Sequence, residues 1–244
     1  LMMATTEEPA RGGTEAALQA AWAAQPEFEY SERVTWPKVG ALLRVRTNLL
    51  VILQGLPGCL PWGMLLTFLN DYLAQDRGLS VATATALVLA LGAGGAIGVL
   101  GGGLVGQWLY NRRKWQMSLF VGGTTLAGVL PTWYLINADL AGALPAAFLA
   151  ALLTGLLSAT VGPNMRAAMM NVNAPETRGV ALALQTTLDD LGKGLGPALV
   201  AAIISRVGRR TAFNIAAAGW IPCGVLLTLT AFTLARDEAA MQRR

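Results

Sequence analysis

The chain has 244 residues, of which 54% are hydrophobic and only 13% are charged, and its formal net charge is +4. Soluble globular domains carry about 25% charged residues, so this chain lacks the polar surface to fold in water and is expected to be embedded in a membrane. The sequence contains no histidine, which excludes Ser-His and Cys-His catalysis and histidine metal sites, and its scattered basic residues do not form the patch of a nucleic-acid-binding protein. We therefore predict no enzyme activity, no cofactor, no metal and no nucleic-acid partner.

Residues 1–45 are polar and of mixed charge, which predicts a cytoplasmic linker that is partly disordered. The first 30 residues contain no apolar run of the kind found in a signal peptide. Because the chain begins with "LMMATTEE" rather than with methionine, we expect it to be a fragment of a longer protein.

Six apolar spans of bilayer length follow, each with roughly 20 residues or more. They are predicted at 48–70, 81–109, 116–136, 142–170, 179–206 and 211–235. The expected fold class is all-α, a polytopic bundle of six transmembrane helices over residues 46–236, followed by a cytoplasmic tail at 237–244. Short strands with turn signals are absent from the sequence pattern, which argues against a membrane barrel.

The basic residues near the span ends predict the orientation, because cytoplasmic loops are enriched in Lys and Arg. One side collects Arg33, Lys38, Arg44, Arg46, Arg112, Arg113, Lys114, Arg166, Arg178, Arg236, Arg243 and Arg244. The other side holds Arg77, Arg206, Arg209 and Arg210. Both termini are therefore expected in the cytoplasm, although the "SRVGRR" loop argues locally against it; the sequence does not tell which membrane holds the protein.

The first span contains "LQGLPGCLPWG". Pro57 and Pro61 lack an amide hydrogen, so we expect this helix to bend or break. Interrupted helices in transporters often line a central cavity, and Gln54 is placed where it would face one. A kink that serves only packing is the alternative.

The second span places glycines at every fourth position, at Gly94, Gly98, Gly102 and Gly106. Small residues on one helical face let a neighbouring backbone approach closely. The stripe therefore predicts a helix interface, serving either static packing or a face that slides during a conformational cycle.

The fifth span carries three formal charges in "LQTTLDDLGKGLGPALV". Asp189 lies about ten residues into the span, roughly 15 Å deep and near the bilayer midplane. Each such charge costs about 2.5–3.5 kcal/mol where it faces lipid, so we expect Asp189, Asp190 and Lys193 to face protein or water. The same face continues through Gln185, Gly192 and Gly196.

Lys193 can neutralise only one of the two aspartates, at spacings i,i+4 and i,i+3. The spare carboxylate is a candidate for proton coupling or cation binding, because burial disfavours its charged form. An ion-pair clamp that fixes helix packing is the alternative. The candidate substrate or coupling residues are Asp189, Asp190, Lys193, Gln185 and Gln54.

The six spans, the glycine-rich second span with its basic loop, and "NVNAPETRGVALALQTTLDDLGKGLGPALV" resemble the carboxy-terminal half of a major facilitator superfamily transporter. Within that superfamily, "QGLPGCLPWG", "FLNDYLAQDRGLSV" and "PETRG…DDLGKGLGP" are most similar to the Spinster-like branch. The resemblance covers residues 44–235, which would be helices seven to twelve.

The family's cytoplasmic loop motif has an aspartate and an arginine followed by basic residues. By resemblance it maps onto Gln107, Trp108, Arg112, Arg113 and Lys114, with Arg178 in the "PETRG" string. Gln107 replaces the aspartate and Trp108 the arginine, so the loop keeps its basic tail but lacks the acidic partner of the family's interhelical charge relay.

The resemblance implies secondary transport by alternating access, with a small-molecule or lipid-like substrate and coupling to a proton or cation. It also implies that the second and fifth spans face a missing amino-terminal six-helix half, and that lipid surrounds the bundle. The alternatives are a membrane enzyme, disfavoured because no histidine or GxSxG motif is present, and a non-transporting assembly or receptor subunit. The substrate is not readable, since no basic cluster is expected at the midplane.

Overall fold

The computed structural model describes residues 34–140 and 142–243, and these residues form an all-α bundle without strands. This agrees with the predicted fold class. The helices are α2 (Trp36–Arg44), α3 (Arg46–Gln75), α4 (Val81–Arg112), α5 (Lys114–Asn137), α6 (Leu144–Ser158), α7 (Val161–Val172), α8 (Pro175–Val207), α9 (Arg209–Ala217), α10 (Trp220–Leu229), the 3₁₀ turn η2 (Thr230–Phe232) and α11 (Leu234–Gln242). Most of the predicted linker lies outside the described residues, and its last part forms α2.

Five of the six predicted spans correspond to helices, or helix pairs, that are long and apolar enough to cross a membrane. They are Arg46–Gln75, Val81–Arg112, Lys114–Asn137, Leu144–Val172 and Arg209–Phe232. The span predicted at 179–206 lies within α8, which has 33 residues but does not belong to this set. The reason is its charge, because Asp189, Asp190 and Lys193 interrupt its apolar run.

Two of the membrane-spanning segments are interrupted. Neither of them is the first span, where Pro57 and Pro61 predicted an interruption. The α-helical hydrogen-bond pattern is interrupted at 159–160, between α6 and α7, and at 218–219, between α9 and α10, although the backbone there stays in the right-handed helical region. Pro163 and Pro222 follow these sites, and each removes the amide donor for the carbonyl four residues earlier. Of the predicted bend or break in the first span, the break does not occur, since α3 is continuous through its prolines. There the indole Nε1 of Trp220 donates to the carbonyl of Gly58 at 2.9 Å, so α10 supports this stretch from outside.

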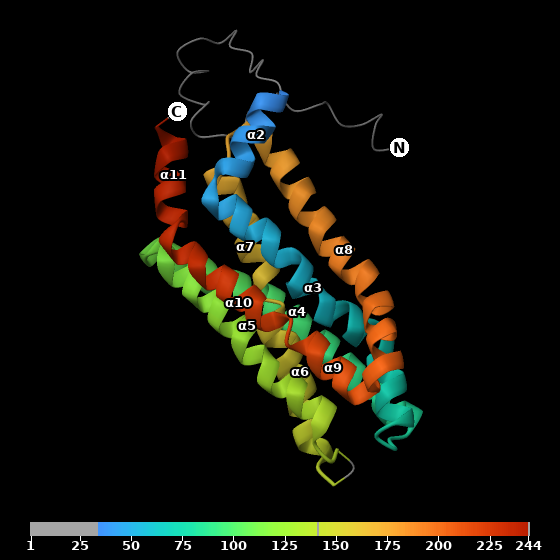
Figure 1. The fold of residues 1–244 in the computed structure, drawn as a ribbon. Helices are drawn as coiled ribbons and strands as arrows, with labels where there is room; N and C mark the ends of the chain where they lie inside the picture. Colours follow the sequence, from blue (N-terminus) through green and yellow to red (C-terminus); the bar gives the residue numbers. More distant parts are fainter. Residues whose placement is uncertain (1–33, 141, 244) are drawn as a thin grey trace, which may run out of the picture.

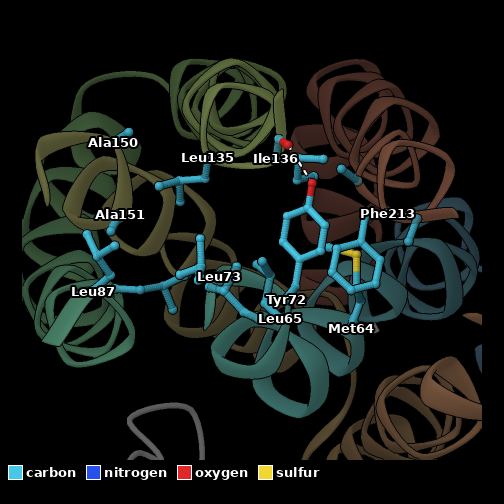
Figure 2. Close-up of a cluster of buried hydrophobic side chains, with 14 of the residues drawn as sticks. Met64, Leu65, Tyr72, Leu73, Leu87, Leu135, Ile136, Ala150, Ala151 and Phe213 are labelled. Carbon is cyan, nitrogen blue, oxygen red and sulfur yellow. Dashed lines mark hydrogen bonds between the residues drawn. The ribbon is translucent and has the colours of Figure 1, made fainter. Parts of the chain in front are cut away.

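The larger hydrophobic core joins α3, α4, α5, α6 and α9 in the half of the bundle away from α2 and α11 (Figure 1). Tyr72 stands at its centre, with its ring 4.7 Å from that of Phe213 and its hydroxyl donating to the carbonyl of Ile136 at 2.7 Å (Figure 2). Leucine and alanine side chains fill the space beside it. A buried phenol with a satisfied hydroxyl adds packing area without an unpaired polar group.

The glycine stripe of α4 packs inside this bundle. A Cβ at Gly94 or Gly98 would collide with the carbonyls of Leu152 and Leu156 on α6, and one at Gly102 would lie 2.8 Å from Cγ2 of Thr160. At its end, Asn164 on α7 donates to the carbonyl of Gly102 at 3.0 Å. The expectation that this stripe faces a missing half is therefore wrong, because α6 and α7 already cover it.

Polar contacts join helices to one another at the end of the bundle that holds α2 and α11. Asp237 of α11 accepts hydrogen bonds of 2.8 Å from the backbone amide and the hydroxyl of Thr47, at the first turn of α3. Beside it, buried Glu238 pairs with Lys114 at 2.8 Å and accepts from the hydroxyl of Tyr110. Two adjacent acidic residues thus join α11 to α3 and to the junction of α4 and α5.

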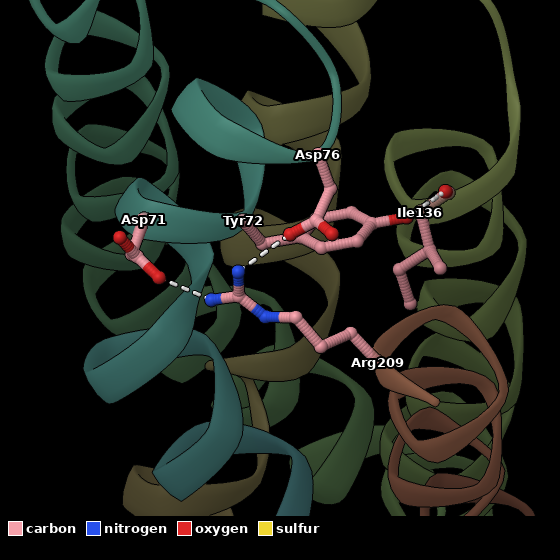
Figure 3. Close-up of polar contacts among 5 residues, drawn as sticks. All are labelled: Asp71, Tyr72, Asp76, Ile136 and Arg209. Atoms are coloured by element: carbon pink, nitrogen blue, oxygen red, sulfur yellow. Dashed lines mark hydrogen bonds and ion pairs between the residues drawn. The ribbon is translucent and has the colours of Figure 1, made fainter. Parts of the chain in front are cut away.

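At the opposite end, Arg209 in the first turn of α9 pairs with Asp71 and Asp76 of the α3 terminus (Figure 3). Arg210 donates to the backbone and side-chain oxygens of Asn137, at 3.0 and 2.9 Å. These contacts give the "SRVGRR" loop a structural role. The two arginines have partners within the protein, which reduces their weight against the predicted orientation.

The glycine packing predicts opposite outcomes for two matched substitutions in α4. Gly98→Ala is expected to destabilise the protein by about 1–3 kcal/mol, because its methyl group meets the α6 backbone. Gly101→Ala places its methyl group in open space and is expected to be neutral or stabilising by up to about 1 kcal/mol. Thermal unfolding of purified protein in detergent measures both; equal midpoints for the two variants would contradict the packing.

Candidate functional site

The contact between α3 and α8 is built from glycines on both helices. A Cβ at Gly192 would lie 2.8 Å from Cβ of Cys59, and a Cβ at Gly63 would lie 2.7 Å from the carbonyl of Lys193. Gly196 faces the backbone of Leu60. The small-residue face of α8 therefore packs within the bundle, and the backbones approach closely enough to set the position of the charged turn between them.

A cavity of about 350 Å³ opens beside this contact. Its walls come from α3, α4, α5, α8 and α10 and from the interruption between α6 and α7. The predicted candidates on its wall are Gln54, Gln185, Asp189 and Lys193. Helix interruptions that border a cavity are tolerated in membrane proteins because the freed backbone groups do not meet lipid; here the interrupted helix is the fourth span rather than the first.

Asp189 is the acidic group of the cavity. Its side chain is half-buried, and its Oδ1 atom is enclosed against Gly55 of α3, without a hydrogen-bond partner among the described residues. Lys193 does not neutralise it through an ion pair; the lysine Nζ lies 3.6 Å from Oδ1 of Asp190 instead. The spare carboxylate is therefore Asp189.

Asp190 lies apart from the cavity. Its side chain is 65% exposed, and it does not contribute to the cavity wall. Adjacent residues on a helix point about 100° apart, so Asp190 faces away from the cavity that Asp189 borders. Leu191, Leu195 and Leu199 are likewise exposed on α8.

Two glutamines line the same cavity, and they differ in whether their side-chain amides have hydrogen-bond partners. The Gln54 amide is satisfied, because Nε2 donates to the carbonyl of Val51 at 3.0 Å and Oε1 accepts from the thiol of Cys223 at 3.1 Å. Gln185 is only 2% exposed, and its Oε1 atom has no donor within the described part of the chain. Burial of an unpaired polar atom costs about 1–3 kcal/mol, so this acceptor needs an explanation.

Arg166 is the cavity residue that the sequence interpretation missed. It was assigned to the cytoplasmic edge by its position near the end of the fourth span, yet it lies on α7 and lines the cavity. Arg166 and Lys193, which the sequence interpretation kept apart, therefore share one cavity. The sequence signal for the interruption that precedes α7 is Pro163, which cannot donate to the carbonyl of Ala159.

The residues assigned to the loop motif lie at the corner of α4 and α5. The Arg112 guanidinium stacks over the Trp108 ring at 3.9 Å, and Gln107 donates to Asn111 at 3.1 Å. Arg113 is exposed, and Lys114 pairs with Glu238. Glu238 thus supplies to this corner the carboxylate that the motif lacks, from a helix that sequence comparison with the motif does not include.

Arg178 lies in the first turn of α8 and donates to the carbonyl of Met170 at 2.8 Å. It joins α8 to α7 across the connection between them. Among residues 34–140 and 142–243, no group of three or more acidic or cysteine side chains is arranged to hold a metal ion.

The sequence profile of the Major Facilitator Superfamily matches residues 4–197 and 51–243. The chain belongs to this superfamily, and together with its apolar helices this defines an integral, multi-pass membrane protein of the transporter class. Comparison with curated proteins and with solved structures gave no match.

The two glutamines predict contrasting effects on stability. Gln185→Met removes an unpaired buried acceptor and is expected to leave the unfolding temperature unchanged or raised, while it weakens transport. Gln54→Met removes two hydrogen bonds of a buried amide and leaves the thiol of Cys223 without its acceptor, so it is expected to destabilise by about 1–3 kcal/mol. Thermal unfolding compares them, and a larger loss for Gln185→Met would show that its amide has a structural role.

Proposed function

We propose that this chain is the carboxy-terminal half of a secondary transporter, related to the Spinster-like branch, which moves a small organic or lipid-like solute by alternating access. An amino-terminal six-helix half completes it, and both termini lie in the cytoplasm. The transport is coupled to a proton or another cation. The observation that supports this proposal best is the unpaired carboxylate of Asp189 on the wall of a cavity inside a membrane bundle.

The position of Asp189 suits a coupling group. Ionisable side chains are expensive in membrane proteins and usually belong to substrate or ion pathways. Charged and titratable groups that face it come from several helices: Cys59 on α3, Arg166 on α7, Cys223 on α10, and Asp190 and Lys193 on α8. A carboxylate that is surrounded in this way changes its interactions whenever a proton, a cation or a solute enters the cavity.

The exposed face of α8 supports the missing half as partner. It presents Asp190 and three leucines outside the bundle, and the Asp190 charge would cost about 2.5–3.5 kcal/mol against lipid. A second helical half packed on this face would shelter this charge. In this arrangement α8 is the sixth membrane span.

Coupling is tested by Asp189→Asn in the full-length protein, reconstituted in vesicles that contain a pH-sensitive dye. We expect solute-driven proton entry to fall at least about tenfold, because the amide cannot exchange a proton, while exchange of labelled solute across the membrane continues. A sodium gradient in place of the pH gradient tests the other coupling ion.

Asp190→Asn is the matched control, since it removes an equal charge one position away and outside the cavity. It is expected to retain coupling. Equal coupling in wild type and in Asp189→Asn would refute the carboxylate role. If the native protein had the mass of a six-span chain and moved no solute under any gradient, the non-transporting subunit would be favoured instead.

A further inference from the structure

The cavity holds more positive than negative charge. Arg166 from α7 and Lys193 from α8 line it, and among residues 34–140 and 142–243 Asp189 is the one acidic residue on its wall. These three side chains come from two helices that meet at the junction of α7 and α8. The excess is one positive charge when Asp189 is ionised, which favours an anionic ligand.

The two cations retain unused donors. Arg166 forms no hydrogen bond or ion pair with any described residue, although a guanidinium has five N–H donors. Lys193 has Asp190 as its ion-pair partner, at 3.6 Å, and both side chains are largely exposed. Such an exposed pair contributes little to stability. The lysine is therefore available to a ligand at small cost.

The buried acceptor of Gln185 is an independent sign of a ligand site. Its Oε1 atom is enclosed, unpaired and part of a residue that lines the cavity. Native proteins rarely leave such an atom unsatisfied without a functional reason. A bound molecule that carries a hydroxyl or an amine beside its anionic group would supply the missing donor.

Much of the remaining wall is apolar, although Gln54, Thr125 and Ser158 also line it. Trp62, Leu66 and Val99 border the cavity, and Leu66 and Val99 are 65% and 45% exposed. Trp62 packs edge-on against Trp220, with ring centroids 6.1 Å apart, so its position is fixed. A ligand with an apolar body would cover these side chains.

We infer that the solute is an amphipathic organic anion, whose oxyanion group is bound by Arg166 and Lys193. Its apolar body lies along Trp62, Leu66 and Val99. This inference deepens the transport function proposed above and rests on it. The arginine gives directional, two-pronged recognition of a carboxylate, sulfonate or phosphate, while the lysine adds a mobile point charge.

Cys59 provides a native reporter of occupancy, because it lies half-buried on the cavity wall, whereas Cys223 is 1% exposed. The full-length protein is placed in phosphatidylcholine nanodiscs and treated with N-ethylmaleimide, and mass spectrometry follows modification of the Cys59 peptide. Four probes are compared: octanesulfonate, methanesulfonate, octyltrimethylammonium and octanol. We expect octanesulfonate to slow the modification at concentrations at which the other three have no effect.

Arg166→Gln and Lys193→Gln are each expected to weaken this protection roughly tenfold or more, with Arg166→Lys intermediate. Arg236→Gln, an exposed cation on α11, is the control and should behave as wild type. Each variant is compared with its own rate in the absence of probe, which removes any direct effect on the thiol. Replacement of octanesulfonate by 1-oleoyl lysophosphatidate distinguishes a soluble anion from a lipid anion, according to which protects at lower concentration.

Equal protection by octyltrimethylammonium or octanol would overturn the inference, as would full protection by methanesulfonate or in Arg166→Gln. If N-ethylmaleimide did not modify Cys59 even in the absence of probe, the cavity would not be open to small molecules. The inference would then be overturned as well. If octanesulfonate protected Cys59 but no solute moved in vesicles, the anion site would be supported and the proposed transport function would be refuted.

Discussion

The close backbone contact of α3 and α8 is the constraint on which the site depends. Glycines on both helices allow it, and a side chain at Gly55 would occupy the space of the Asp189 carboxylate. The helices touch at this turn, and one oxygen of the carboxylate lies against Gly55 without a hydrogen-bond partner among the described residues. The bundle therefore keeps an unpaired carboxyl oxygen at its cavity, an arrangement that costs stability and is typical of functional sites.

The rest of the bundle compensates for this site by well-satisfied packing elsewhere. Glycines of α4 fit against α6, Tyr72 is satisfied in the main core, and ion pairs close both ends through Glu238 and Arg209. At the cavity, Gln185 and Asp189 each have a buried acceptor without a partner among the described residues, while similar unpaired atoms on Arg77, Gln116 and Ser118 lie elsewhere. A rigid frame around a few unsatisfied polar groups suits a site that binds and releases its ligand in each cycle.

The sequence predicted the membrane bundle and the position of its spans because apolar runs and charge interruptions are local properties. It could not predict which neighbour a helix face meets, so the Gly98 stripe was assigned to a missing half when it packs on α6. Arg166 was placed at the membrane edge because span length alone hides the break that starts α7. The sequence also allowed Lys193 to pair with either Asp189 or Asp190, at spacings i,i+4 and i,i+3. Only the packing of α8 against α3 decides between them.

The central claim is that the Asp189 carboxylate responds to solute in the cavity. Infrared difference spectroscopy of the full-length protein, with and without octanesulfonate, tests it most directly, because carboxylate and carboxylic acid groups absorb at separate frequencies. The account predicts a carboxyl signal on binding that is absent in Asp189→Asn and retained in Asp190→Asn. A binding spectrum without any carboxyl signal, or one that is unchanged in Asp189→Asn, would contradict it.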